Sequence, residues 1–555
     1  MLNIDLVKDI ISEIPYIKKI ISLKKNNSFL EGKIEILFEG LDKPLEFEFK
    51  IYPQYPLKNY GFESIKFINS KLLKYSHVMG DGSICIHTAC NKDIRQKLLI
   101  DFHSLKNWIE KYYLNNHKDR KYEHIIIHPH LINDKYYSYF FTDVDYKFKK
   151  GNFGEVKLSL LNIGNYKNKR INNYLVQSFS TKKEEYIECQ WNESYKNKSS
   201  SNLGFYIFIE KHPAYYNKFA FQGFNELETY MSQSFLDLIH KFEIKNSDKS
   251  KGMIVPIFIG YNTIKAEIYW QVALLEVGKF PIKEDYILKN NILVPIKKLR
   301  EQEIKWALTR DVSYKLFFGR GSLSTRITNA KVLIIGIGAI GSVIAKSLVK
   351  GGCKFVDIAD YDIKEPTNVC RSEYTFIDGI NDKVMELNKI LTNHSPFVHI
   401  NIFKKEYFED IIKNYSTDLN GKDSFASILN KYDIIFDCST DNDLMYLLNL
   451  LELKSDLINL SITNHAKDLV CAFYPNIYHF VDTQYRELLN NDLYDMYEPN
   501  GCWSPTFKAS YIDIAFLAQM ALKKINHFYE KNKAKSNFVI KTEKNNNFFV
   551  RVEEY

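Results

Sequence analysis

Three glycines in the C-terminal half are spaced to hold a nucleotide phosphate. The apolar run Val332 to Ile335 leads directly into Gly336, Gly338 and Gly341, and a helix is expected from about residue 339. Glycines permit a tight turn and let backbone N–H groups approach a phosphate, while a helix N-terminus adds partial positive charge. The segment predicts a nucleotide site without choosing between NAD and ATP.

A carboxylate follows the next apolar run, where ribose recognition would need one. Asp360 stands after Phe355 to Ala359, and Asp362 follows two residues later. A carboxylate at the end of a second strand can accept hydrogen bonds from ribose hydroxyls. An NAD-dependent oxidoreductase would show the same feature, so this residue indicates a nucleotide and not yet an activity.

Four polar residues further along favour ATP and carboxylate activation. Asn368, Arg371 and Lys383 are suited to bind phosphate, and Asp441 is suited to bind Mg²⁺. Adenylation of a carboxylate requires cations near the transferring phosphate and carboxylates near the metal. An oxidoreductase would instead require an acid residue beside the hydride, so these four residues disfavour that activity.

The order of these residues resembles the ThiF/HesA/MoeB and ubiquitin-activating superfamily. That family shows a glycine loop, an Asp-x-Asp strand end, Asn-x-x-Arg, a glycine-to-lysine segment (one residue longer here) and a Cys-Thr-Asp-Asn-like segment. The matching positions are Gly336 to Gly341, Asp360/Asp362, Asn368/Arg371, Gly379/Lys383 and Cys438 to Asn442. Ala339 replaces a glycine usual in the loop, and the family's upstream arginine corresponds to either Arg310 or Arg320.

The resemblance implies a fold, cofactors and residue roles. It implies a doubly wound, Rossmann-like ThiF adenylation domain that forms a homodimer and uses ATP and Mg²⁺. Asp360 would bind ribose, Arg371 and Lys383 would bind phosphates, and Asp441 would bind magnesium.

One cysteine of this half lies where a thioester could form. Activating enzymes that pass a protein onward hold it on a nucleophilic thiol in a polar, partly exposed setting. Cys502 lies in an irregular segment, Glu498 to Phe507, ahead of a predicted helix over Ala509 to Lys524. A buried structural cysteine is the alternative reading of Cys502. Four others lie in or beside apolar strands or motif segments and are set aside: Cys353, Cys370, Cys438 and Cys471.

The first 125 residues carry a second cysteine loop. An amphipathic run, Ile4 to Ile21, precedes strand-like segments, a Tyr-Pro turn, the loop Asp81 to Ile86 and a helical run, Leu98 to Tyr113. This order resembles a ubiquitin-conjugating domain, which implies that Cys85 accepts the carried protein and delivers it to an amine. The predicted strands are Gly32 to Glu39, Pro44 to Tyr52 and Ser64 to Ile68.

The surroundings of this cysteine depart from the conjugating family. His77 is followed by Val and Met where the family has Pro and Asn, and it stands closer to Cys85 than is usual. The family's asparagine helps to stabilise an oxyanion, and His87 is a candidate substitute. Cys90 remains a rival nucleophile to Cys85, and an inert folded module remains the alternative for the whole region.

The two resemblances together match one kind of fusion. A conjugating-like N-terminus and an activating-like C-terminus resemble the activating/conjugating fusion proteins of bacterial type II CBASS antiphage systems. That family implies adenylation of the C-terminus of a cGAS-like nucleotidyltransferase (CD-NTase), thioester carriage and ligation to a target. A different bacterial ubiquitin-like system and a non-catalytic scaffold of degenerate domains are the alternatives.

Three regions must position these residues. Residues 1–125 read as an α+β conjugating-like domain, residues 126–300 as a mixed α+β connecting domain, and residues 301–555 as an α/β adenylation domain. The connecting region holds aromatic strand-like pieces, Tyr136 to Phe141 and Leu203 to Ile209, with a polar stretch expected to be exposed, Asn192 to Ser201, between them.

Composition excludes several classes of function. The chain has 555 residues, a net charge of +8 and no dense basic block with aromatic interleaving, so nucleic-acid binding is not expected. Its eight cysteines include no Cys-x-x-Cys pair, which indicates reduced thiols and a cytoplasmic location. No apolar run is long enough to cross a membrane, and no signal peptide is recognised.

Overall fold

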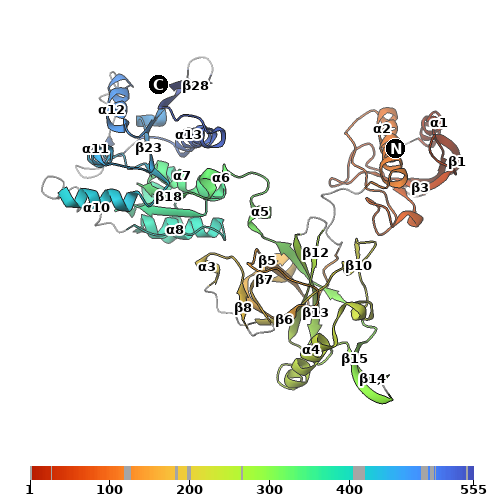
Figure 1. Cartoon of the computed structure of the whole chain (residues 1–555). Helices are drawn as coiled ribbons and strands as arrows, with labels where there is room; N and C mark the ends of the chain where they lie inside the picture. The colour runs from red at the N-terminus through yellow and green to blue at the C-terminus, as the bar shows by residue number, and fades with distance from the viewer. Residues whose placement is uncertain are drawn as a thin grey trace.

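The computed structural model shows three bodies along the chain (Figure 1). None of the helices among the residues it describes is long and apolar enough to cross a membrane. The described residues are 3–26, 28–117, 127–181, 185–196, 202–263, 267–289, 291–403, 419–488, 498–499, 505–506, 508–544 and 548–555.

The N-terminal body is an antiparallel sheet with helices at both ends of its sequence. Its strands pair in the order β1-β2-β3-β4. Every second residue of β2 is buried, so one face of the sheet packs on the core with α1 and α2. The elements are α1 (Ile4–Ser12), β1 (Ile17–Asn26), β2 (Phe29–Ile36), β3 (Leu45–Ile51), β4 (Ile65–Ile68), η1 (Ser70–Leu72), α2 (Ile94–Trp108) and a π-helical extension, η2 (Ile109–Leu114).

The amphipathic run predicted from Ile4 to Ile21 is two elements. The helix ends at Ser12, and the strand β1 begins at Ile17. Pro15 lies between them, and a proline disfavours helical backbone in the residue before it. The helix predicted over Leu98 to Tyr113 lies within α2 and its extension.

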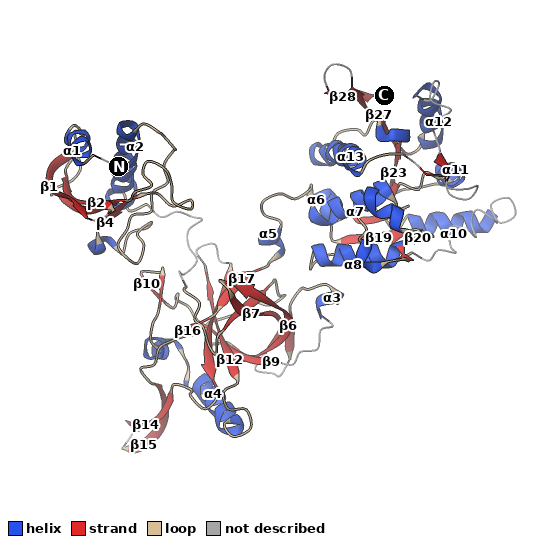
Figure 2. Cartoon of the chain, turned by 180° about the vertical axis from the view of Figure 1, so that it is seen from behind, coloured by secondary structure: helices blue, strands red, loops and turns tan. Residues whose placement is uncertain are grey.

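The middle body is a nine-stranded sheet that closes on itself (Figure 2). Toward the C-terminal end of this body, β16 pairs with β13 at one edge of the sheet, and β17 pairs with β5 at the opposite edge. Only Ala307 separates β16 from β17, so this short segment joins the two edges into a barrel. The paired strands are β5 (Lys135–Phe141), β6 (Phe153–Tyr166), β7 (Lys169–Ser180), β8 (Tyr186–Glu188), β9 (Asn202–Phe208), β12 (Ile254–Asn262), β13 (Ile268–Glu276), β16 (Lys305–Trp306) and β17 (Leu308–Asp311).

The remaining elements of the middle body lie outside that sheet. The hairpin β14–β15 projects from the barrel in Figures 1 and 2. Because β16 and β17 belong to the barrel, the sheet runs past the boundary at residue 300 expected from the sequence. These elements are α3 (Glu193–Lys196), β10 (Ala214–Tyr215), β11 (Phe219–Ala220), η3 (Phe224–Tyr230), α4 (Gln233–Asn246), β14 (Ile282–Lys289) and β15 (Ile292–Leu299).

The C-terminal body is a seven-stranded sheet in the order β19-β18-β22-β23-β24-β27-β28. The first four strands of this order are parallel, as a doubly wound domain requires, and the last three each run antiparallel to the strand before them. The strands are β18 (Lys331–Ile335), β19 (Phe355–Ala359), β22 (Ile434–Asp437), β23 (Asp456–Ile462), β24 (Asp468–Phe473), β27 (Phe538–Lys544) and β28 (Phe548–Glu554).

Helices cover both faces of this sheet (Figure 2). In β18, Val332 and Ile334 enter one core with α7, α8 and α13, while Leu333 and Ile335 enter a second core with α10, α11 and α12. Side chains of a strand alternate between faces, so a continuous apolar run fits a strand buried on both sides. The helices are α5 (Tyr314–Phe317), α6 (Thr325–Thr328), α7 (Ala339–Lys350), α8 (Lys383–His394), α10 (Leu419–Leu429), α11 (Asn442–Leu450), α12 (Ile477–Leu488) and α13 (Tyr511–Lys531).

The barrel contacts the C-terminal body through a buried asparagine. Asn192 donates from its backbone N–H to the Pro396 carbonyl (2.7 Å) and from Nδ2 to the Ser395 carbonyl (3.0 Å). The Trp191 and Phe397 rings stack beside it. The polar stretch that begins at Asn192 was expected to be exposed, but Asn192 is buried because it packs in this contact.

The barrel contacts the N-terminal body through a buried lysine. Lys218 is 2% exposed, and its Nζ donates to the carbonyl oxygens of Tyr75 (2.7 Å) and Val78 (3.0 Å). Val78 lies on the loop that leads to Cys85, so the barrel holds one side of that loop.

Candidate active site

The glycine loop connects β18 to the N-terminus of α7, as the sequence predicts. Gly336 has φ +75°, and a Cβ there would collide with the Ser439 backbone. A Cβ at Gly341 would collide with the Gly336 carbonyl oxygen. Both positions therefore require glycine for close packing of the chain against itself.

The N-terminus of α7 is open to an anion. Gly338 is the N-cap residue, no side chain caps the helix, and a Cβ at Gly338 would meet nothing within 4 Å. The first N–H groups of a helix have no partner within it and attract negative charge. Open space beside uncapped N–H groups fits the phosphates of ATP.

The carboxylate predicted to hold ribose is fixed beside this loop. Asp360 accepts hydrogen bonds from the backbone N–H of Ile337 and of Asp362, both at 2.8 Å. Burial raises the pKa of Asp360, against the opposing effects of nearby Lys383 and of these two N–H groups. The carboxylate is thus oriented by the chain before any ligand binds.

The lysine predicted to hold phosphate lies within the same cluster. Lys383 begins α8 and is mostly buried, and its Nζ lies 2.6 Å from Asp362 Oδ2. Its backbone N–H also donates to the Asp362 carbonyl. The structure thus brings Asp360, Asp362 and Lys383 together at the end of β19. Asp362 binds the Lys383 ammonium group, which a bound phosphate would also contact.

Asp441 lies across the glycine loop, on the turn after β22. The packing of Gly336 on Ser439 brings this turn against the loop. Asp441 Oδ1 caps α11 by accepting from the N–H groups of Asp443 (2.9 Å) and Leu444 (3.1 Å). Its Oδ2 receives no hydrogen bond from the residues that the structure describes, so one oxygen remains for a cation. The described residues hold no cluster of three or more metal-ligating side chains.

A buried aspartate that sequence reasoning did not single out shapes this turn. Asp437 is 1% exposed, and it accepts from the N–H and hydroxyl of Ser439 and from Asn459 Nδ2. Burial raises its pKa, against the effect of these hydrogen bonds. Ser439 Oγ in turn accepts from the Asp441 N–H at 3.2 Å. Asp437 stands at the end of an apolar strand, and this position is the sequence signal that could have identified it.

Asn368 and Arg371 lie on one short 3₁₀ helix, η4 (Pro366–Arg371). Asn368 Oδ1 accepts from the Glu365 N–H, so this side chain caps its own helix. The segment after Arg371 is fastened to the glycine loop, because Tyr374 donates from its hydroxyl to the Ile337 carbonyl at 2.6 Å. The structure therefore places the Asn-x-x-Arg element next to the loop.

A buried ion pair supports the far side of this cluster. Lys364 Nζ lies 2.6 Å from Glu386 Oε2, and both side chains are 0% exposed. Glu386 Oε1 accepts from the Thr375 N–H, and Lys364 donates to the Thr375 carbonyl. The pair ties the segment between β19 and α8 to α8 itself, one helical turn after Lys383.

The candidate arginines upstream of the loop occupy different places. Arg310 lies in β17 of the barrel, exposed, and donates to the Thr309 carbonyl. Arg320 is exposed and lines a shallow pocket with Tyr314 and Phe318. Neither contacts the glycine loop within the described chain.

The cysteine predicted to carry the first thioester, Cys502, lies outside the described residues. Three of the cysteines set aside, Cys353, Cys438 and Cys471, are buried, and burial raises their thiol pKa values, to about 12 for Cys353. Cys370 is exposed, and its thiol donates to the Thr367 carbonyl.

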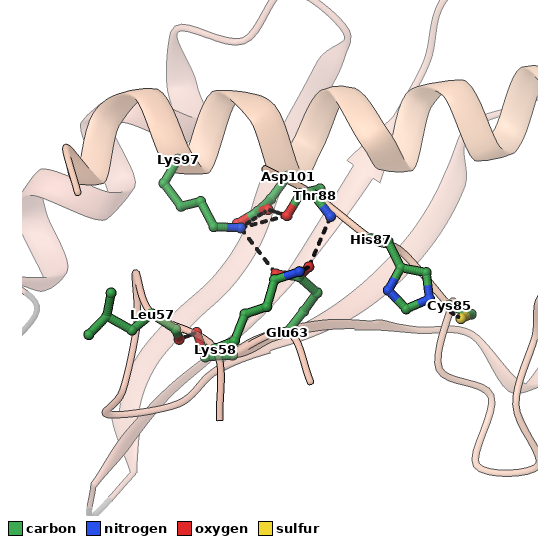
Figure 3. Close-up of polar contacts among 9 residues, drawn as sticks. Leu57, Lys58, Glu63, Cys85, His87, Thr88, Lys97 and Asp101 are labelled. Atoms are coloured by element: carbon green, nitrogen blue, oxygen red, sulfur yellow. Dashed lines mark hydrogen bonds and ion pairs between the residues drawn. The ribbon is translucent and has the colours of Figure 1, made fainter. Parts of the chain in front are cut away.

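The N-terminal cysteine loop presents Cys85 with a histidine beside it (Figure 3). His87 Nε2 lies 3.6 Å from Cys85 Sγ. The thiol is half-buried, and burial raises its pKa. The Cys85 N–H donates to the His77 carbonyl at 2.8 Å, which fixes the loop at the start of this segment. Cys90 is exposed, and its thiol makes no hydrogen bond with any described residue.

A buried charge cluster beside this loop was not predicted. Lys97 and Asp101 of α2 are 1% and 0% exposed and lie 2.5 Å apart. Glu63 and Thr88 join them (Figure 3). The Tyr55 hydroxyl also donates to Asp101 at 2.9 Å. A Lys–Asp pair four residues apart looks like a surface pair in the sequence, so no sequence signal marks its burial.

Residues 308–552 match the ThiF family. The matched range contains the glycine loop, the Asp360–Lys383 cluster and the Asp437–Asp441 turn. This part of the chain is therefore similar to the ThiF family, and it includes most of the seven-stranded mixed sheet.

Curated relatives also match part of the chain. The ATP-dependent ubiquitin transferase-like protein Cap2 of Enterobacter hormaechei subsp. hoffmannii (strain UCI 50) is 29% identical over 40% of this chain and 37% of its own length. The adenylyltransferase and sulfurtransferase UBA4 of Scheffersomyces stipitis is 28% identical over 28% of this chain and 36% of its own length. The match thus spans a little over a third of these relatives.

Solved structures cover a similar share of the chain. PaaA aligns over 41% of this chain and 74% of its own, with 16% identity and a TM-score of 0.32. Escherichia coli MccB with ATP aligns over 41% and 65%, with 16% identity and a TM-score of 0.28.

Proposed function

We propose that the ThiF family domain of this chain uses ATP to adenylate the C-terminal carboxylate of a protein. The observation that carries the proposal is the family match over 308–552, within which the glycine loop, Asp360 and Asp441 meet at one edge of the sheet. An NAD-dependent oxidoreductase would not need the turn that holds Asp441.

Different residues of the chain bind different parts of ATP. The N-terminus of α7 receives the phosphates, and Asp360 accepts hydrogen bonds from ribose. Arg371 and Lys383 offset the charge on the phosphates, and Asp441 holds Mg²⁺ through Oδ2. When bound, ATP supplies the adenylyl group that activates the carboxylate.

We further propose that the activated protein moves to cysteine. Cys502 accepts the acyl group first, Cys85 accepts it next, and an amine of the target then takes it as an amide. Lys508 and Tyr511, just after the segment of Cys502, attach to the site: the His465 N–H donates to the Lys508 carbonyl, and the Tyr511 hydroxyl donates to Glu373, two residues after Arg371. The Tyr511 contact holds the start of α13 against the segment after Arg371, which supports the choice of the cysteine that precedes this helix in the sequence.

The proposed carried protein is a cGAS-like CD-NTase, and the proposed setting is antiphage CBASS signalling in the cytoplasm. The likeness to the protein named Cap2 supports this choice over another bacterial ubiquitin-like system. A homodimer through the adenylation domain belongs to the same proposal.

A non-reducing gel tests the relay directly. Purified protein is incubated with ATP, Mg²⁺ and a candidate CD-NTase, and adducts are compared with and without thiol. We expect a thiol-sensitive adduct that disappears in Cys502→Ala and changes its pattern in Cys85→Ala. Adducts that persist in the double variant would refute both cysteine assignments. An adduct with another ubiquitin-like protein but not with the CD-NTase would refute the CBASS assignment alone.

A further inference from the structure

We propose that His87 is the base that takes the proton from the Cys85 thiol, and that Thr88 positions it there through the buried Lys97–Asp101–Glu63 cluster. This inference rests on the proposed role of Cys85 as a thioester carrier. It names the residues that would make that thiol reactive.

The backbone brings His87 to the same side as Cys85. Along Cys85, Ile86 and His87 the side chains are half-buried, buried and exposed. In extended chain, alternate side chains point to the same side, so burial of Ile86 turns the other two outward together. The resulting distance of 3.6 Å between Nε2 and Sγ is within reach of a sulfur hydrogen bond (Figure 3).

Thr88 fixes the end of this short segment at two atoms. Its N–H donates to Glu63 Oε1 at 2.9 Å, and its hydroxyl donates to Asp101 Oδ1 at 2.7 Å. The Lys97 ammonium donates to the same hydroxyl at 2.6 Å and to Glu63 Oε2 at 3.2 Å. Because Lys97 and Asp101 are fully buried, Thr88 and therefore His87 have little freedom to move away from the thiol.

The charged groups packed around the segment balance one another. Glu63 and Lys58, between β3 and β4, form an ion pair at 2.8 Å, and Lys97 and Asp101 on α2 form another. These two positive and two negative side chains give their cluster no net charge. His77, from the preceding segment, meets Cys85 through its backbone carbonyl. Burial alone raises the pKa of the thiol, so the imidazole that touches the sulfur is the group able to accept its proton.

The loading step balances with this pair. His87 Nε2 accepts the proton of the Cys85 thiol, and the sulfur electron pair forms a bond to the carbonyl carbon of an acyl thioester. The bond from that carbon to the donor sulfur breaks, and the donor thiolate takes the proton from His87. One thiol and one thioester give one thiol and one thioester, with no oxidant or further reactant.

Alkylation of the full-length protein without ATP tests the pair. A limiting amount of iodoacetamide is added across a pH series, and the modification of Cys85 and Cys90 is measured by peptide mass spectrometry. Only the thiolate reacts, so we expect His87→Gln to slow Cys85 alkylation at neutral pH by roughly tenfold or more. The difference should vanish at alkaline pH, where the thiol ionises unaided. Cys90, exposed in the same protein, reports any general change.

Matched variants separate catalysis from folding. His103→Gln removes an exposed histidine of α2 and should leave the Cys85 profile unchanged. Thr88→Val removes the hydroxyl but keeps the shape, and it should weaken Cys85 reactivity in the same pH range as His87→Gln. Thr88→Ser keeps the hydroxyl, so its Cys85 reactivity should match that of the unaltered protein. A Cys85 profile in His87→Gln that follows the unaltered protein would overturn the inference. So would equal profiles for the Val and Ser variants of Thr88.

The two proposals fail separately. If the alkylation profile depends on His87 but no ATP-dependent adduct forms, the thiol–imidazole pair stands and the proposed conjugation is wrong. If the adduct forms on Cys85 while His87→Gln changes neither alkylation nor loading, the pair is wrong and the conjugation stands. If both proposals are correct, loading of Cys85 should slow by about 10²-fold in His87→Gln.

Discussion

The Asp441 carboxylate has an observed role as a helix cap and a proposed role at the cation, and one substitution can separate the two. Oδ1 caps α11, and Oδ2 remains for a cation. Asn is as good an N-cap as Asp but carries no charge. Asp441→Asn should therefore unfold at the same temperature as the unaltered protein, while ATP–pyrophosphate exchange falls by roughly 10²-fold.

The alanine variant provides the comparison for Asp441. It removes the cap as well, which costs about 1 kcal/mol of stability. Calorimetry of the two variants distinguishes the roles. Full exchange activity in Asp441→Asn would rule out a role for the charge in ATP use.

The glycines of the loop should respond differently to the same added methyl group. In Gly336→Ala the new Cβ meets the Ser439 backbone at a positive φ, which should cost about 1–3 kcal/mol and separate the Asp441 turn from the loop. Gly338→Ala adds a methyl group in open space. It should fold normally and lose affinity for ATP, as measured by calorimetric titration. Normal ATP affinity in Gly338→Ala would show that the phosphates lie elsewhere.

At the scale of elements, the buried Lys364–Glu386 pair should stabilise the segment between β19 and α8. Removing one partner leaves an uncompensated buried charge, so Lys364→Met or Glu386→Gln should each cost about 3–5 kcal/mol in denaturant unfolding. The double variant Lys364→Met/Glu386→Leu should cost less than the sum.

An ion pair made by an exposed lysine of the same helix is the control. Lys389 lies 2.9 Å from Asp378, and Lys389→Met should have a much smaller effect on unfolding. Equal losses at the two lysines would mean that burial of the first pair does not matter to stability.

Local pattern predicted the elements that carry the proposed nucleotide site. Phe355 to Ala359 is β19 with the predicted ends, and the helix after Gly338 begins at Ala339. These features depend on neighbouring residues: an apolar run, then glycines, then helical spacing. The roles of Asp362 and Asn368 as internal hydrogen-bond partners were not visible, because those depend on where the chain folds back.

Elements that depend on distant pairing could not be predicted. In the barrel, Ser138 pairs with Leu308, far along the chain, so no local pattern indicates closure. Apolar runs also do not indicate strand direction, so the antiparallel pairing of β24 with β23 could not be predicted from them. The charge cluster around Lys97 could not be predicted either, since Glu63 and Thr88 come from separate segments of the chain.

At the scale of the whole molecule, Lys218 should hold the N-terminal body against the barrel. Its amine is the donor for two carbonyls, and without it both would be buried unpaired, at about 1–3 kcal/mol. Lys218→Met should increase the radius of gyration in X-ray scattering and slow transfer to Cys85. Pyrophosphate exchange should not change, because its site lies in another body.

An exposed lysine nearby is the control for Lys218. Lys211→Met should leave both scattering and transfer unaltered. Scattering from Lys218→Met that matches the unaltered protein would contradict the docking role.

The closing segment of the barrel also sets an order of events during synthesis. A ribosome releases β5 and β13 long before residues 305–311, so both edges remain unpaired while the rest of the barrel is already available to fold. Open strand edges invite pairing with other chains. The next segment to emerge leads into the seven-stranded sheet that begins with β18. A nascent chain that stalls before residue 311 would therefore carry an incomplete barrel with unpaired strand edges, and these edges are protected from aggregation only when translation reaches the proposed ATP-binding domain.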